Sequence, residues 1–217
     1  MEYEKGLREA GTYTEIEIQE KTMLMNSLKS KLMQHHELYR FPVKAELWED
    51  IWDQCINPIG SNWVGGGHQP GADTMDEQSN ISYQNKSGQI KGSHVDITSH
   101  RLAKQAGPSF NDKLNFISQK HCDKYVLLSR DEKDWKKSIK SYNLMIFDSK
   151  LLDFRSLEWS EHIPSKGKNK GKHNGGYIGK GDPGKFSARI DGEGSSNQLH
   201  ISININYIGG CHKIIIP

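Results

Sequence analysis

Asp73, Gln84 and Lys86 have the residue types and the spacing of a metal-dependent hydrolytic site. Asp73 ends the turn-forming stretch PGAD, ten residues separate it from Gln84, and Lys86 is two positions further on. Strand residues two apart point to the same face. Carboxylate and amide oxygens bind hard divalent cations, and a lysine can position a nucleophile or offset developing charge. The spacing predicts phosphodiester hydrolysis, and the alternative is an ordinary hydrophilic β-hairpin.

The stretches GAD (71–73) and QNK (84–86) resemble the motif of the PD-(D/E)XK nuclease superfamily, in particular of its type II restriction endonucleases. That motif is a Pro-Asp-like dipeptide, a spacer, and acid-X-Lys on the next strand. Gln84 stands where the acid is expected, as in some restriction enzymes of the superfamily, and no Pro directly precedes Asp73. The resemblance covers roughly residues 44–130.

The resemblance implies a Mg²⁺-dependent, site-specific endonuclease that cuts double-stranded DNA, in a prokaryotic cytoplasm and with no organic cofactor. Asp73 and Gln84 would bind the metal, and Lys86 would orient or activate the attacking water. The superfamily often adds a Glu from the preceding helix. Glu49 is therefore a further predicted catalytic and metal-binding residue, favoured over Glu46, although a solvated helix face is the alternative for both. Cutting both strands of a palindrome calls for two sites, so a homodimer is expected.

A Lys/Gly-rich segment, residues 164–185, holds six Lys and seven Gly against the single Asp182. It reads as a flexible cationic surface loop, either solubilising or in contact with DNA phosphates. Asn197 and Gln198 suit adenine contact, or form a polar turn. The predicted DNA-contact residues are Arg101, Lys104, Lys168, Lys170, Lys172, His173, Lys180, Asn197 and Gln198. A non-catalytic nucleic-acid-binding module that uses this loop is the alternative function.

Several other classes find little support in the sequence. The chain has no apolar run long enough to span a membrane and no secretion signal at its N-terminus. Cys55, Cys122 and Cys211 lack the spacing of a zinc site or a disulfide framework. The stretch GGYIGKG (175–181) matches only the YIG half of the GIY-YIG nucleases, and the glycine-rich loop fits no nucleotide-binding motif.

Hydrophobic periodicity predicts the elements that must position the candidate site. Residues 14–40 and 44–56 have helical spacing, residues 79–90 and 93–99 alternate as a hairpin, and residues 57–73 are rich in turn formers. A helix is expected at 109–122, and strands are expected at 124–129, 142–148, 185–190, 198–208 and 213–217. We therefore expect an α/β (α+β) fold with a central mixed β-sheet flanked by helices and a restriction-endonuclease-like core. The expected single domain comprises a helical N-terminus plus catalytic core (1–150) and a β-rich, DNA-contacting part (151–217).

Overall fold

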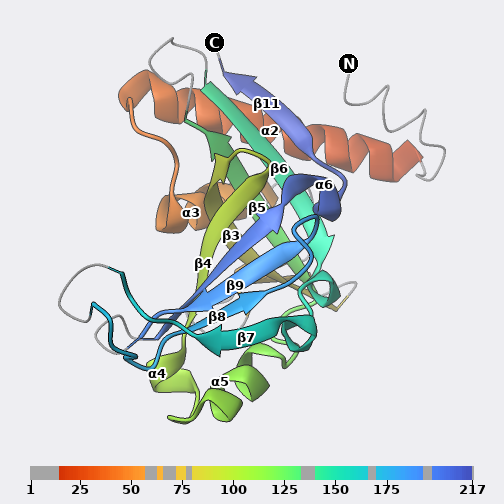
Figure 1. The fold of residues 1–217 in the computed structure, drawn as a ribbon. Coiled ribbons are helices and arrows are strands. Elements are labelled where there is room, and N and C mark those ends of the chain that lie inside the picture. The colour runs from red at the N-terminus through yellow and green to blue at the C-terminus, as the bar shows by residue number, and fades with distance from the viewer. Residues whose placement is uncertain are drawn as a thin grey trace.

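The computed structural model describes residues 15–56, 63–65, 72–76, 80–132, 140–165, 170–192 and 197–216 (Figure 1). Its helices are α2 (Glu15–Leu38), α3 (Ala45–Ile56), α4 (Leu102–Gln105), α5 (Phe110–Ile117) and α6 (Ile205–Ile208), with 3₁₀ turns η3 (Ser149–Leu151) and η4 (Phe154–Ser156). Its strands are β1 (Trp63–Gly65), β2 (Thr74–Asp76), β3 (Ile81–Lys91), β4 (His94–Arg101), β5 (Lys124–Asp131), β6 (Lys140–Asp148), β7 (Glu158–Glu161), β8 (Tyr177–Lys180), β9 (Phe186–Ile190), β10 (Gln198–Asn204) and β11 (His212–Ile216).

The described strands form one mixed sheet in the order β11-β6-β5-β3-β4-β10-β9-β8-β7, with β1 and β2 attached beside β3. The β3–β5 pair is parallel and is connected through α5, whereas the other neighbouring strands run antiparallel. The expected fold class is confirmed, because a central mixed sheet is flanked by helices and the C-terminal part is mostly β (Figure 1).

Two hydrophobic cores lie on opposite faces of the sheet. On one face, Leu28 and Leu32 of α2 and Trp48 and Trp52 of α3 pack against Tyr83 and other residues of β3, β5, β6 and β11. On the other face, residues of β4, β5, β6, β9 and β10 pack against α5 and the 3₁₀ turns. Successive residues of β3 therefore face different cores, with Tyr83 and Asn85 toward α3 and Gln84 and Lys86 toward α5.

The predicted hairpin is present, with its turn at Gly92–Ser93, at the end of the expected SGQIKG stretch. Its two strands pair only over Gln89–Lys91 and His94–Asp96, whereas β4 pairs with β10 from His94 to Arg101. At the point of divergence, a Cβ on Gly88 would lie 2.6 Å from the carbonyl oxygen of Asp96, so only glycine fits there without a backbone shift. Below this point β3 pairs with β2 through Tyr83, which places Asp73 beside Gln84.

Three predicted boundaries were wrong for identifiable reasons. The helix expected at 109–122 ends at Ile117, where His121 Nε2 donates to the carbonyl of Phe116 at 2.7 Å. The strand expected at 198–208 ends at Asn204, whose side chain caps α6. The segment 164–185 is not loop throughout: β8 occupies Tyr177–Lys180, and Gly179 there lies against Trp159.

The stretch 57–73 contains the short strand β1, and most of its remaining residues lie outside the described part.

Candidate active site

Asp73 and Lys86 form a partly buried ion pair at the start of β2. Lys86 Nζ lies 3.2 Å from Asp73 Oδ2, and the two side chains are 16% and 27% exposed. The same carboxylate oxygen accepts a hydrogen bond of 2.7 Å from the backbone N–H of Asn85. This bond is possible because the β3–β4 pairing ends at Gln89, so no β4 residue takes the Asn85 amide. The sequence-predicted Asp and Lys are therefore brought together.

Gln84 lies beside Asp73. The Asp73 backbone N–H donates to the carbonyl of Tyr83 at 2.8 Å and its carboxylate accepts from Asn85, so that Asp73 contacts the residues on both sides of Gln84. Gln84 is only 5% exposed, and its Oε1 is buried without a hydrogen-bond partner. Burying an unpaired amide oxygen costs about 1–3 kcal/mol, and a ligand that this oxygen could bind would offset that cost.

The walls around this group come from β5 and the loop before it. Tyr125 is the β5 neighbour of Gln84 in the parallel register, and Cys122 lies close enough to interact with Lys86, Asp73 and the backbone of Gln84. Burial raises the pKa of the Cys122 thiol to about 12, which keeps it protonated and non-nucleophilic at neutral pH. Burial also raises the pKa of Tyr125, whose ring stacks on Phe147.

A β-bulge directs His100 toward the site. Between the pairs Thr98–His200 and Arg101–Gln198, β4 has one residue more than β10. His100 is 8% exposed, and its ring centroid lies 4.6 Å from that of His121. Burial, reinforced by the neighbouring His121 ring and the Lys86 ammonium, lowers the pKa of His100 to about 3. A neutral imidazole thus lies near the Lys86 ammonium.

Glu49 is half-buried on α3, and that helix packs against the face of β3 that presents Tyr83. Gln84 and Lys86 point to the other face, so Glu49 does not share a sheet face with them. Its role as a metal ligand stays a prediction.

Some predicted DNA-contact residues lie at the ends of β4 and β10. Arg101 is exposed and pairs in register with Gln198. Asn197 has a left-handed φ of 46°, and its Oδ1 accepts a hydrogen bond from Lys113 Nζ at 3.4 Å. Its amide oxygen therefore already has a structural partner. Lys168 and the side chain of Lys104 lie outside the described residues.

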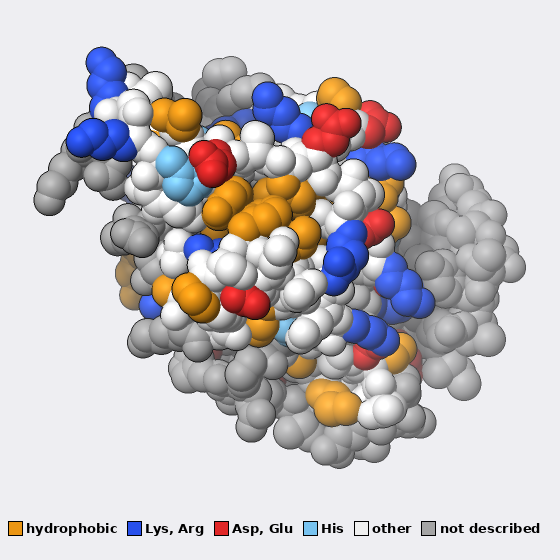
Figure 2. All heavy atoms as spheres, turned by 60° about the horizontal axis from the view of Figure 1, so that its bottom comes forward, with side chains coloured by type: hydrophobic (Ala, Val, Ile, Leu, Met, Phe, Trp, Pro, Cys, Tyr) orange, Lys and Arg blue, Asp and Glu red, His pale blue; other side chains and the backbone are white. Residues whose placement is uncertain are grey.

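The remaining predicted contacts surround β8. Lys170, Lys172 and Lys180 are exposed, whereas His173 Nδ1 lies 3.3 Å from Glu161 Oε2. Figure 2 shows the end of the molecule where α4 and α5 lie, with Lys and Arg side chains interspersed with acidic ones around a hydrophobic patch. In this view the positive charge is distributed and does not form one continuous stripe.

The residues that sequence reasoning missed are His100, Cys122 and Tyr125. Each reaches the site through tertiary structure: a bulge in β4, the loop after α5, and the parallel β3–β5 pairing. No local motif marks them. The sequence marks them only by their position before and after the predicted helix. If β5 is parallel to β3, that helix belongs to the crossover that brings the chain back beside β3.

The donor set fits a hard divalent cation. The described residues contain no cluster of three or more His, Cys, Asp or Glu side chains arranged to hold a metal ion. Asp73 and the unpartnered Oε1 of Gln84 instead offer one carboxylate and one neutral oxygen. Oxygen ligands suit Mg²⁺, but this pair carries one negative charge fewer than two carboxylates would.

Comparison with known proteins finds no family model that matches the chain and no significantly similar curated protein. None of the helices that the structure describes has both the length and the apolar character needed to cross a bilayer.

Proposed function

We propose that the chain is a Mg²⁺-dependent endonuclease of the type II restriction class, which hydrolyses phosphodiester bonds of double-stranded DNA. One observation carries the proposal: the Asp73–Lys86 pair, at 3.2 Å, lies at the same level of the sheet as Gln84, whose Oε1 is buried and unpartnered. An acid and a neutral oxygen at one sheet position can bind a divalent cation, and the lysine beside them can stabilise charge that develops on a phosphoryl group. The same three residues carry the resemblance to the PD-(D/E)XK superfamily.

Each residue has a role that follows from its atoms. Asp73 and Gln84 would hold the cation, which when bound supplies polarisation of a phosphoryl oxygen and activation of a water. Lys86, as an ammonium, would donate to the attacking water or to a non-bridging phosphate oxygen. The Asp73 carboxylate limits the positions available to Lys86 Nζ, and pre-organisation of this kind is a large part of catalysis.

The expected partners remain part of the proposal. Exposed Arg101, Lys170, Lys172 and Lys180 would contact the phosphate backbone, which carries no sequence information itself. A homodimer would place two sites on the two strands. Helix α2 offers a surface for it, since its apolar residues Met23 and Leu38 are 48% and 77% exposed.

Plasmid cleavage tests the proposal. Wild-type protein with Mg²⁺ is expected to give discrete fragments, and Asp73→Ala and Lys86→Ala are expected to lose at least about a hundredfold in rate, the scale of one electrostatic contact to a transition state. Lys91→Ala is the matched control. Lys91 lies on the same strand and pairs with Asp96 at 2.8 Å, but its side chain is 64% exposed and distant from Gln84.

Three results are decisive. Fragments that both site variants lose and Lys91→Ala retains support the nuclease. Cleavage at the wild-type rate in both site variants overturns the assignment of the site. DNA binding without cleavage, equal in all four proteins, points instead to the non-catalytic nucleic-acid-binding module.

A further inference from the structure

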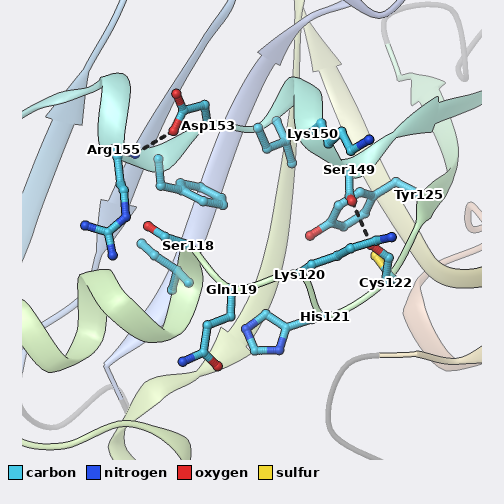
Figure 3. A pocket seen from close by; sticks show the side chains of 13 residues that line it. Ser118, Gln119, Lys120, His121, Cys122, Tyr125, Ser149, Lys150, Asp153 and Arg155 are labelled. Carbon is cyan, nitrogen blue, oxygen red and sulfur yellow. Dashed lines mark hydrogen bonds between the residues drawn. The ribbon is translucent and has the colours of Figure 1, made fainter.

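A pocket of about 360 Å³ opens between the end of α5, the loop that leads to β5, and the 3₁₀ turns η3 and η4 (Figure 3). Its apolar surface includes Tyr125, Leu152 and Phe154, and three cations, Lys120, Lys150 and Arg155, also line it. This volume is at the small end of ligand sites, enough for one small molecule and far too little for a duplex.

The cations of this pocket are exposed at its rim, where an anion can reach them. Lys120 pairs with Asp123, and Arg155 Nη2 donates to Asn115 Oδ1 at 2.8 Å, which leaves other N–H groups of the guanidinium for a ligand. The one carboxylate of the lining, Asp153, accepts from the backbone N–H of Arg155 at 3.1 Å. The lining therefore has more positive than negative charge beside an apolar floor.

The pocket shares two of its residues with the candidate active site. Tyr125 lies directly beside Gln84 in the β3–β5 register, and Cys122 interacts with both Lys86 and Asp73. The pocket therefore adjoins the candidate active site. A base on an apolar and aromatic floor with its phosphate on Lys or Arg is a standard way to hold an unstacked nucleotide.

We propose that this pocket binds a single unstacked nucleotide of the DNA strand next to the scissile phosphate, with the base on the Tyr125–Leu152–Phe154 floor and the phosphate on Lys150 and Arg155. The inference rests on the proposed nuclease function. It adds a subsite that selects a nucleotide by enclosing it, separate from the residues that carry out hydrolysis.

Binding of deoxynucleoside 5′-monophosphates, measured by calorimetry without metal, tests the pocket apart from catalysis. Wild-type protein is expected to bind at least one of the four. The double variant Lys150→Ala/Arg155→Ala is expected to bind at least about tenfold more weakly, because two charge-assisted contacts are lost. Asp73→Ala should bind like wild type. Lys29→Ala/Arg40→Ala, which removes the same two residue types from exposed positions on and just after α2, is the matched control.

The other arms identify what the pocket binds. Inorganic phosphate should bind more weakly than the nucleotide, and equal affinity would overturn a role for the base. The bound nucleotide should inhibit plasmid cleavage by wild-type protein, and binding without inhibition would show a site for free nucleotides instead of the DNA strand. Cleavage with no nucleotide binding refutes the subsite and leaves the nuclease standing. Nucleotide binding in a protein that cuts no DNA refutes the nuclease.

Discussion

At the residue scale, Gln84 is the most informative position, because a neutral amide stands where the motif has an acid. Gln84→Glu is expected to tighten Mg²⁺ binding by about tenfold, since a second carboxylate adds attraction at a site with little solvent. Without metal, the same change should lower thermal stability, because a buried carboxylate would lie beside Asp73. Calorimetric titration and thermal unfolding, with and without Mg²⁺, measure the two effects.

Gln89→Glu, the same change at a half-buried position of β3, is the matched control and should alter Mg²⁺ affinity little. A loss of stability in Gln84→Glu that Mg²⁺ does not restore would show that Gln84 is a core amide. In that case Asp73, Gln84 and Lys86 would match the PD-(D/E)XK motif in residue type without binding a metal as the motif does.

His100 determines a pH dependence of stability. Its pKa is lowered to about 3 in the folded state and is near 6.5 when unfolded, so between these values only the unfolded chain takes up the proton. Proton uptake by the unfolded chain therefore leaves the free energy of unfolding unchanged above pH 6.5. As the pH falls toward 3 it lowers that free energy, by up to a few kcal/mol on the order of magnitude. His36, with a pKa lowered to about 4 mainly by burial, acts in the same direction.

His100→Phe keeps an aromatic ring against Phe116 and removes the titration. Its free energy of unfolding, from urea titrations at pH 7, 5.5 and 4, should therefore fall less steeply with pH than that of wild type. Equal slopes for the two proteins would show that His100 is solvated when the protein is folded.

At the element scale, one hydroxyl connects α2, the turn after it and β6. The Tyr142 hydroxyl donates to His36 Nε2 at 2.8 Å and accepts from the backbone N–H of Val43 at 3.0 Å. Tyr142→Phe would leave that buried N–H unpaired, so we expect a loss of about 1–3 kcal/mol in the free energy of unfolding. Tyr39→Phe is the control, since Tyr39 is 48% exposed. Chemical denaturation distinguishes the two, and equal small losses would contradict the hydrogen-bonded chain.

The elements that carry strong periodicity could be predicted from the sequence, and those set by tertiary contacts could not. Alternation predicted β3, apolar runs predicted β5 and β6, and helical spacing predicted α2 and α3, because burial of one face or of both faces leaves a recognisable pattern. Helix α5 ends early because a histidine four residues beyond it binds its last turn, which no propensity encodes. The Asp73–Lys86 contact followed from residue spacing, whereas His100 and the pocket beside Tyr125 depend on a bulge and a parallel crossover.

At the scale of the whole molecule, one continuous sheet and a shared hydrophobic core join the N-terminal and C-terminal parts. β10 pairs with both β4 and β9, so the sheet continues without interruption from the candidate site into the β-rich part. The core under α5 is likewise built from residues on both sides of position 151, from Val95 and Leu127 to Ile190 and Ile201. Neither part can bury its apolar surface alone, which argues for one cooperative unit.

Hydrogen exchange tests whether the chain unfolds as one cooperative unit. Ile201→Ala, at a position 1% exposed on β10, should cost about 2–5 kcal/mol through lost burial and a residual cavity. If the chain unfolds as one unit, the slowest amides of α3, on the opposite face, should lose the same amount of protection as those of β10. Ile215→Ala, at a position 50% exposed on β11, should leave both nearly unchanged. Loss of protection confined to residues after 151 would instead separate the β-rich part as a second unit, and the DNA-contacting surface proposed for it would then move independently of Asp73 and Lys86.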